Sequence, residues 1–181
     1  MLEKTPRISL RVPFLAESFA EGVFVYLYRD PRQVLGSMMD AWLSGKFRTY
    51  PNLPGWSGPP WSLLLTPGWR ELNGLPLADV VVRQWEATTR WLLDDMEALP
   101  PERRRVIRYG ALVADPQGEL EKLCGSVGLG WDRQLGASLP LARYTLSQPS
   151  EDKWRRHEAE ILPRLPGIQA TLDRAARFAG A

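Results

Sequence analysis

Apolar residues recur along the chain in two patterns, one typical of buried strands and one typical of helices. Residues 23–28 (Val-Phe-Val-Tyr-Leu-Tyr) are all apolar or aromatic and often β-branched, which predicts a parallel strand buried on both faces. A second, shorter strand is predicted at 106–109. Between them, apolar side chains at intervals of three or four predict a long helix, which ends at Pro100-Pro101: Val82, Trp85, Thr89, Leu92, Met96 and Leu99.

Each predicted strand is followed by an Asp-Pro pair, which favours the start of a helix. Asp is a preferred N-cap, and Pro suits the first helical position because its missing N–H would be unpaired there. Asp30-Pro31 therefore predicts a helix to about residue 43. Asp115-Pro116 predicts a second helix that stops at Gly128.

Strands that alternate with helices predict an α/β fold with a parallel sheet flanked by helices. The length of 181 residues fits a single domain over residues 1–181. Only two strands are evident, so the sheet looks incomplete. Three further helices are expected, the first capped by Ser9: residues 9–19, 151–162 and 167–178.

Residues 50–76 follow neither pattern and are dense in proline and tryptophan. A loop of this length in a compact domain is usually functional or disordered, and its tryptophans argue against disorder. Trp56, Trp61 and Trp69 could stack on an aromatic ligand or pack against one another. The sequence leaves both interpretations open.

Composition narrows the class of protein. Apolar residues make up 44% and charged residues 24%, as in ordinary soluble proteins. No apolar run approaches the ~18 residues of a membrane helix, and no signal peptide is evident. A net charge of +2 is too small to predict nucleic-acid binding. Cys124 is the only cysteine, so we expect no disulfide framework, no metal site and a cytoplasmic location.

Arg29 and Ser37 are the strongest candidates for chemistry. Arg29 follows the first strand, the position at which open parallel sheets bind ligands, and Ser37 lies eight residues later on the next helix. An arginine fork, a hydroxyl and the positive end of a helix together suit a phosphate group. The alternative, an internal salt bridge by Arg29 and a solvent-facing Ser37, stays open on the residues alone.

This arginine and serine motif, Arg29-Asp30-Pro31-Arg32 with Ser37, resembles the 3′-phosphate motif of PAPS-dependent sulfotransferases, most closely the bacterial and tyrosylprotein-type branches. PAPS is 3′-phosphoadenosine 5′-phosphosulfate. Four other segments resemble the same family in the same order: Lys4-Thr5-Pro6-Arg7; Trp85; Val106-Ile107-Arg108-Tyr109 with Leu112, Asp115 and Pro116; and Leu146-Ser147 with Ser150 to Trp154.

The resemblance implies a P-loop-type sulfotransferase fold that transfers a sulfuryl group from PAPS, the co-substrate, to a hydroxyl or amine acceptor. The acceptor would be a small molecule or a peptide, and residues 50–76 would cover it. The family's roles then carry over as follows: Lys4 stabilises charge at the bridging oxygen as the catalytic residue, Arg29 and Ser37 hold the 3′-phosphate, Tyr109 lies near the nucleotide, and Ser150 and Lys153 close over the phosphates or the transferring group.

The sequence departs from the family pattern at its start. The Gly-rich loop that cradles the 5′-phosphosulfate is absent, and the segment that follows it in the family begins here at Lys4. We therefore expect a truncated domain that lacks the first strand, loop and helix. A late start or a natural truncation is favoured over a partner chain that supplies them. No general base is assigned, because Pro6 stands where the cytosolic branch has histidine, and Gly110 replaces a usual glutamate.

Two other functions compete with this one. A non-catalytic remnant would bind adenosine 3′,5′-bisphosphate, or act as a regulatory or scaffold protein; a Gly-rich loop in frame upstream would argue against it. A P-loop kinase or nucleic-acid-binding domain is disfavoured, because the chain has no Gly-Lys-Ser/Thr motif and no basic stripe.

Four expectations concern the surface and core. An incomplete sheet would expose the edge of strand 23–28, so a homo-oligomer or a partner chain is expected to cover it. His157 is expected at the surface on a polar helix, and the basic run at 103–105 in a solvated turn. Cys124, Trp91 and Met96 are expected in the core.

Overall fold

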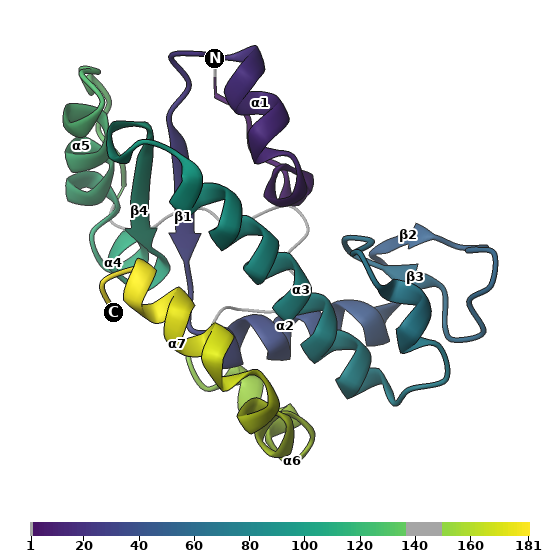
Figure 1. The fold of residues 1–181 in the computed structure, drawn as a ribbon. Coiled ribbons are helices and arrows are strands. Elements are labelled where there is room, and N and C mark those ends of the chain that lie inside the picture. Colours follow the sequence, from purple (N-terminus) through teal and green to yellow (C-terminus); the bar gives the residue numbers. More distant parts are fainter. Residues whose placement is uncertain (1, 137–149) are drawn as a thin grey trace.

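The computed structural model describes residues 2–136 and 150–181. Its main sheet is parallel: β1 (Phe24–Tyr28) pairs with β4 (Arg104–Arg108), so that Tyr28 lies opposite Arg108 at the carboxyl end. An antiparallel ribbon joins β2 (Arg48–Tyr50) to β3 (Trp61–Ser62). The predicted α/β class with a parallel sheet flanked by helices is confirmed (Figure 1).

The helices follow the predicted order. They are η1 (Pro6–Leu10), α1 (Val12–Ser18), α2 (Pro31–Ser44), η2 (Trp69–Leu72), α3 (Leu77–Ala98), η3 (Pro101–Arg103), α4 (Tyr109–Ala114), α5 (Pro116–Ser126), η4 (Lys153–His157), α6 (Glu158–Ile161), η5 (Leu162–Ile168) and α7 (Gln169–Phe178). Elements labelled η are 3₁₀-helices.

The Asp-Pro pairs start helices as predicted. Asp30 accepts a hydrogen bond from the backbone N–H of Arg32 at 2.8 Å, and Asp115 accepts one from the N–H of Gly118 at 2.9 Å. Gly128 follows the end of α5 with a left-handed φ of 72°, which confirms it as the stop. The cap predicted at Ser9 is wrong: Thr5 caps η1, and α1 starts separately at Val12.

The main core lies between α2, α3 and the segment 50–76. Leu35, Trp61 and Val81 are fully buried there. Gln84 of α3 is also buried and ties this region together, because its amide accepts from Trp42 at 3.0 Å and donates to the carbonyls of Ser62 and Leu64. These bonds fix the irregular segment against both helices.

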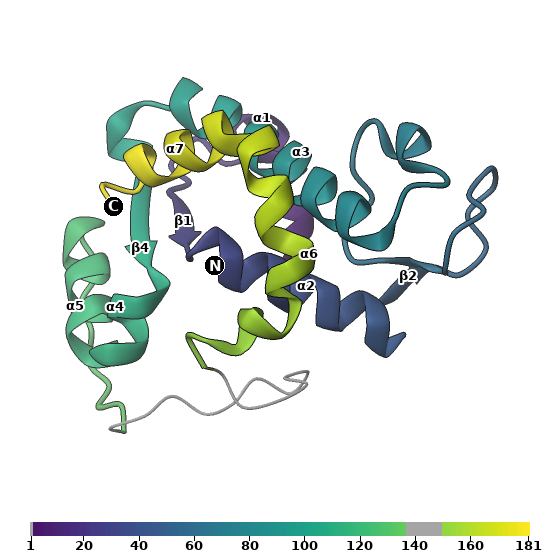
Figure 2. The ribbon, with the colours of Figure 1, turned by 90° about the horizontal axis from the view of Figure 1, so that it is seen from below.

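The prediction that the first strand is buried on both faces is wrong. Phe24 and Tyr26 pack into a second core cluster with residues of α1, α3 and α7, which lie over one face of the sheet (Figures 1 and 2). Val25 and Leu27 point the other way and are 42% and 46% exposed. On that face α5 packs on β4, where Ile107, the register partner of Leu27, is buried and Arg105 donates to Ser126, but Val25 and Leu27 of β1 remain partly exposed.

The basic run at 103–105 does not form a solvated turn as expected. It leads into β4, and its guanidinium groups donate to main-chain carbonyls. Arg103 bonds the carbonyls of Gly22 and Phe19 at 3.0 and 2.7 Å, which joins the end of α1 to the sheet. Two core expectations also fail: Trp91 is 50% exposed and Cys124 is only half-buried, whereas Met96 is buried as expected.

Candidate functional site

Three polar residues at intervals of four share one side of the start of α2. Arg29 directly follows β1, and its Nε donates to Oε1 of Gln33 at 3.0 Å. Ser37, one turn further, is exposed. Gln33 was not among the predicted site residues, although its spacing of four residues from Arg29 is a signal that could have identified it.

Tyr109 meets Arg29 because the two parallel strands end together. Tyr28 pairs with Arg108, so the next residue of each chain segment emerges at the same edge of the sheet. The Arg29 guanidinium lies 4.6 Å from the centroid of the Tyr109 ring, a cation–π contact. Tyr109 starts α4 and does not end the strand as predicted. The contact aligns the guanidinium without neutralising it.

The charged residues at this edge of the sheet differ in whether they have a partner of opposite charge. Asp30 pairs with Arg32, with Nη2–Oδ2 at 2.7 Å and Nε–Oδ1 at 3.1 Å. Burial raises the pKa of Asp30, but the hydrogen bonds and charge of Arg32 outweigh it and hold that pKa below its usual value. In the described parts of the chain, no carboxylate pairs with Arg29. Its charge is therefore available for an anion, and the alternative of an internal salt bridge finds no partner there.

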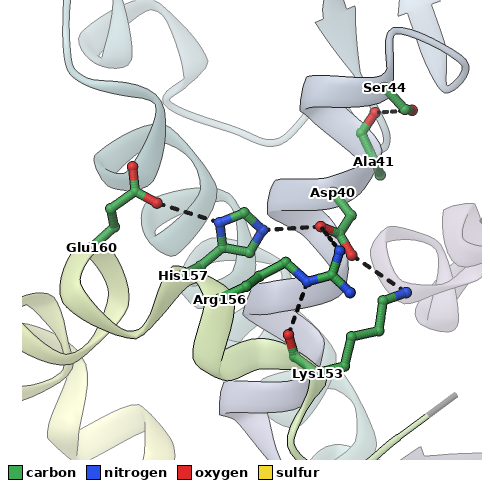
Figure 3. Close-up of polar contacts among 7 residues, drawn as sticks. All are labelled: Asp40, Ala41, Ser44, Lys153, Arg156, His157 and Glu160. Atoms are coloured by element: carbon green, nitrogen blue, oxygen red, sulfur yellow. Dashed lines mark hydrogen bonds and ion pairs between the residues drawn. The ribbon is translucent and has the colours of Figure 1, made fainter. Parts of the chain in front are cut away.

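The carboxylate of Asp40 contacts three cationic or polar side chains from one turn of the C-terminal segment (Figure 3). His157 Nε2 lies 2.9 Å from Oδ1, Lys153 Nζ lies 3.4 Å from Oδ2, and Arg156 Nη1 lies 3.5 Å from Oδ1. Burial raises the pKa of Asp40, but the hydrogen bond from His157 and the nearby positive charges lower it overall. Lys153 is thereby held on α2 one turn beyond Ser37.

His157 is not at the surface, as its polar neighbours in sequence suggested. The residue is 8% exposed, and its second ring nitrogen, Nδ1, lies 3.3 Å from Glu160 Oε2. The error has a physical cause: η4 packs across α2, and this places the imidazole against Asp40, 117 positions away in sequence. No local pattern records such a contact.

The remaining predicted site residues lie apart from this group or at its border. Ser150 is exposed, and its hydroxyl accepts from the N–H of Asp152 at 3.3 Å. Lys4 is exposed just before η1, and no hydrogen bond or ion pair within residues 2–136 and 150–181 engages it. Leu146 and Ser147, part of the C-terminal motif, lie outside the described residues.

An open cleft of about 450 Å³ lies beside Lys4, between the N-terminal segment and the β2–β3 ribbon. Polar residues such as Thr5, Arg7 and Arg48 line it together with apolar residues such as Leu64. Other lining residues are Pro6, Leu10, Arg11, Phe47, Thr49, Tyr50, Leu63 and Leu65.

The tryptophans of segment 50–76 pack against one another. The Trp61 ring centroid is 4.9 Å from that of Trp56, 6.1 Å from that of Trp69 and 5.3 Å from that of Trp42 on α2. Trp61 is fully buried. Of the two interpretations that the sequence left open, the geometry favours mutual packing.

Residues 2–136 and 150–181 contain neither a membrane-spanning helix nor a metal-binding cluster of side chains. No helix there has both the length and the apolar character that a bilayer crossing demands. No cluster of three or more His, Cys, Asp or Glu side chains in the same residues could hold a metal ion.

An unneutralised arginine, a hydroxyl and a helix start at the carboxyl end of a parallel sheet define an α/β protein with a site suited to phosphate. The comparison with known families is more specific. The model of the Sulfotransferase family matches residues 1–133. The chain therefore belongs to the sulfotransferase family.

The individual proteins that the chain resembles are also sulfotransferases. The chain is 26% identical over 161 residues to the omega-hydroxy-beta-dihydromenaquinone-9 sulfotransferase Stf3 of Mycobacterium bovis and to that of Mycobacterium tuberculosis. The match covers 89% of this chain but 36% of each relative, so the chain spans about a third of their length. A sulfotransferase domain from the curacin biosynthetic pathway shares the fold, with a TM-score of 0.57 and 18% identity over 98% of this chain and 61% of that domain.

Proposed function

We propose that this chain holds the 3′-phosphate of PAPS in a sulfotransferase that transfers a sulfuryl group to a hydroxyl or amine acceptor. Arg29 and Ser37 bind the phosphate, Gln33 orients Arg29, and Tyr109 lies beside the nucleotide. Lys153 and Ser150 approach the phosphates from the C-terminal segment. The lone Cys124 fits a reducing compartment such as the cytoplasm.

One observation carries the proposal: Arg29 is oriented from both sides yet has no carboxylate partner among the described residues. Gln33 fixes its Nε at 3.0 Å and the Tyr109 ring supports its plane at 4.6 Å. A half-buried guanidinium that is held in place but left uncompensated suits a phosphate, which accepts two parallel N–H bonds from such a fork.

The reaction breaks the S–O bond between the sulfuryl group and the 5′-phosphate of PAPS and forms a bond from sulfur to the acceptor oxygen or nitrogen. The acceptor loses its proton to a base, and adenosine 3′,5′-bisphosphate leaves. Negative charge grows on the bridging oxygen as the S–O bond breaks, so a cation there lowers the barrier. Lys4 is our candidate for that cation.

The cleft beside Lys4 is our candidate for the acceptor site. Both arginine and leucine residues line this cleft. A pocket with a few polar groups and a largely apolar lining is typical of small-molecule sites. Residues 50–76 contribute Tyr50 and Leu63–Leu65 to this cleft, which supports their proposed role as the acceptor cover.

A Gly-rich phosphosulfate loop is absent from the 181 residues, so the 5′ end of PAPS needs a binding element from elsewhere. The alternative function follows from the same fact. A non-catalytic protein could bind adenosine 3′,5′-bisphosphate through Arg29 and Ser37 and act as a regulatory or scaffold protein. Formation of a sulfated product from PAPS, abolished in Lys4→Ala, would separate the enzyme from this alternative.

Calorimetric titration of adenosine 3′,5′-bisphosphate into the purified chain tests the proposed phosphate site. We expect saturable binding that Arg29→Ala weakens by at least about tenfold, since a charge-assisted bond contributes about 1.5–3 kcal/mol. Arg83→Ala is the matched control, because Arg83 is an exposed arginine on α3 that pairs with Glu86, away from the proposed site. Affinity that is equal in the wild type and in Arg29→Ala would refute the assignment.

A further inference from the structure

Asp40 is compensated by more positive charge than one carboxylate needs. Its side chain is 11% exposed and contacts Lys153, Arg156 and His157, all from the single turn η4. A carboxylate this buried is costly unless paired, so the contacts stabilise the turn on α2. Because Asp40 has three partners, one of them can move away and the carboxylate still remains paired.

The same turn sits unusually close to α2. A Cβ atom added to Gly36 would lie 2.6 Å from Cβ and 2.7 Å from Cα of Trp154. Trp154 is 6% exposed, and the Arg32 guanidinium lies 5.3 Å from its ring centroid. The turn is thus seated between Arg32 and Asp40, on the stretch of α2 that carries Ser37.

Distances distinguish the three partners of Asp40. His157 approaches within 2.9 Å and has its other nitrogen oriented by Glu160, whereas Lys153 and Arg156 remain at 3.4 and 3.5 Å. His157 therefore provides the close, directed contact, and Lys153 the looser one (Figure 3).

We propose that Asp40 and His157 are positioning residues that latch the η4 turn onto α2, and that they hold Lys153 beside Ser37 until a nucleotide phosphate takes it from Asp40. When Lys153 moves, His157 and Arg156 still compensate Asp40. This inference rests on the proposed function, because it assigns the phosphate to Ser37 and Lys153.

A double-mutant cycle between His157 and Lys153 tests the latch. His157→Leu keeps the size of the buried side chain but removes both of its polar contacts; His157→Met serves if the leucine variant does not fold, as judged by circular dichroism. Titration of adenosine 3′,5′-bisphosphate should show about tenfold weaker binding in Lys153→Ala and in His157→Leu, and little further loss in the double variant.

Two more variants separate positioning from general stability. His157→Gln places an amide N–H near the position of Nε2 and should restore most of the affinity. Arg155→Ala is the matched control, since Arg155 lies on the same turn but pairs with Asp152 and Glu158 and not with Asp40. Hydrogen exchange of the amides at 153–157 reports the latch without nucleotide, and should accelerate in His157→Leu but not in Arg155→Ala.

The outcomes are distinct. Unchanged exchange at 153–157 in His157→Leu would overturn the latch itself. Faster exchange with fully additive losses of affinity would reduce His157 to a structural residue and overturn the positioning of Lys153. Failure of the wild-type chain to bind the nucleotide would sink the proposed function and, with it, the role of Lys153, while the exchange result would still judge the contact between Asp40 and η4.

Discussion

Two adjacent residues at the end of β1 show how local bonding decides which charge is left for a ligand. Asp30 caps α2 and is bound twice by the Arg32 side chain, so neither partner retains free charge. Among the described residues, Arg29 contacts only neutral groups, the Gln33 amide and the Tyr109 ring. The motif Arg-Asp-Pro-Arg thus separates a structural pair from an arginine that can bind phosphate.

The pair of Asp79 and Arg164 leads to a prediction about pH. Arg164 Nε and Nη2 each lie 2.8 Å from an oxygen of Asp79, and these bonds lower the pKa of Asp79 below its usual 3.8, against the smaller opposing effect of burial. The folded state then binds fewer protons than the unfolded state. The stability from this pair is full above about pH 5 and is lost as pH falls through the lowered pKa.

Asp79→Asn should therefore lower the free energy of unfolding at pH 7 by about 1 kcal/mol, a modest value because both side chains are partly exposed. Urea denaturation at pH 7 and at pH 3 measures this, and the gap from wild type should narrow at pH 3. Asp173→Asn is the control, since Asp173 accepts a hydrogen bond from the neutral Gln169 and forms no ion pair within the described residues. An equal gap at both pH values would contradict the assignment.

For single residues, the sequence predicted those roles that depend on neighbouring positions in the chain. The Asp30 cap, and the spacing that places Ser37 on the helix that follows Arg29, depend on neighbours within eight positions. His157 could not be placed in this way, because its environment is set by Asp40 on a distant helix. Its burial follows from tertiary packing, which a local polar pattern does not encode.

Among the elements, α2 and η4 form the closest contact that bears on the site. Gly36 allows it, since any side chain there would meet the backbone of Trp154. Gly36→Ala should destabilise the chain by about 1–3 kcal/mol, because backbone cannot move aside as a flexible side chain can. This loss outweighs the gain in helix propensity of about 1 kcal/mol.

Thermal unfolding would measure this effect, with an expected fall in Tm of about 2–4 °C per kcal/mol for a chain of this size. Gly110→Ala is the matched control: Gly110 lies in α4 with nothing within 4 Å of an added Cβ, so it should be neutral or slightly stabilising. A Gly36→Ala variant as stable as Gly110→Ala would show that the two helices do not meet as described.

Sequence patterns identified most elements but not their junctions. β1, β4, α2, α3 and α5 were predicted because each has a strong period or a cap of its own, whereas the short strands β2 and β3 were not predicted. The segment at 151–178 was harder, since Pro163 and Pro166 break it into 3₁₀ and α turns that no single period describes. The role of residues 103–105 was missed because their partners are carbonyls, which sequence patterns do not show.

In the described parts of the molecule, α1, α3 and α7 cover one face of the parallel sheet, while on the other face α5 packs on β4 and leaves β1 exposed. Phe24 and Tyr26 are covered, while Val25 and Leu27 on the opposite face are 42% and 46% exposed. Alternation places Arg29 on the same side as Val25 and Leu27. The exposed apolar side chains of β1 therefore adjoin the proposed nucleotide site.

Such a face should drive association. Contiguous exposed apolar residues and a free strand edge both favour contact with another chain. We expect the purified chain to exceed its monomer mass of 20.5 kDa in light scattering as concentration rises. The double variant Val25→Thr/Leu27→Thr should shift it toward the monomer, because threonine keeps the preference for strands while removing apolar surface. Unfolding free energy should change by less than about 1 kcal/mol, since both side chains are already partly exposed.

Leu43→Gln separates this face from apolar surface in general. Leu43 is 63% exposed on α2, more than either strand residue, so its loss removes at least as much apolar surface from solvent. If association depends on the sheet, Leu43→Gln leaves the mass unchanged and only the strand variant lowers it. A wild-type chain that stays monodisperse at the monomer mass at every concentration would contradict the prediction that Val25 and Leu27 drive association.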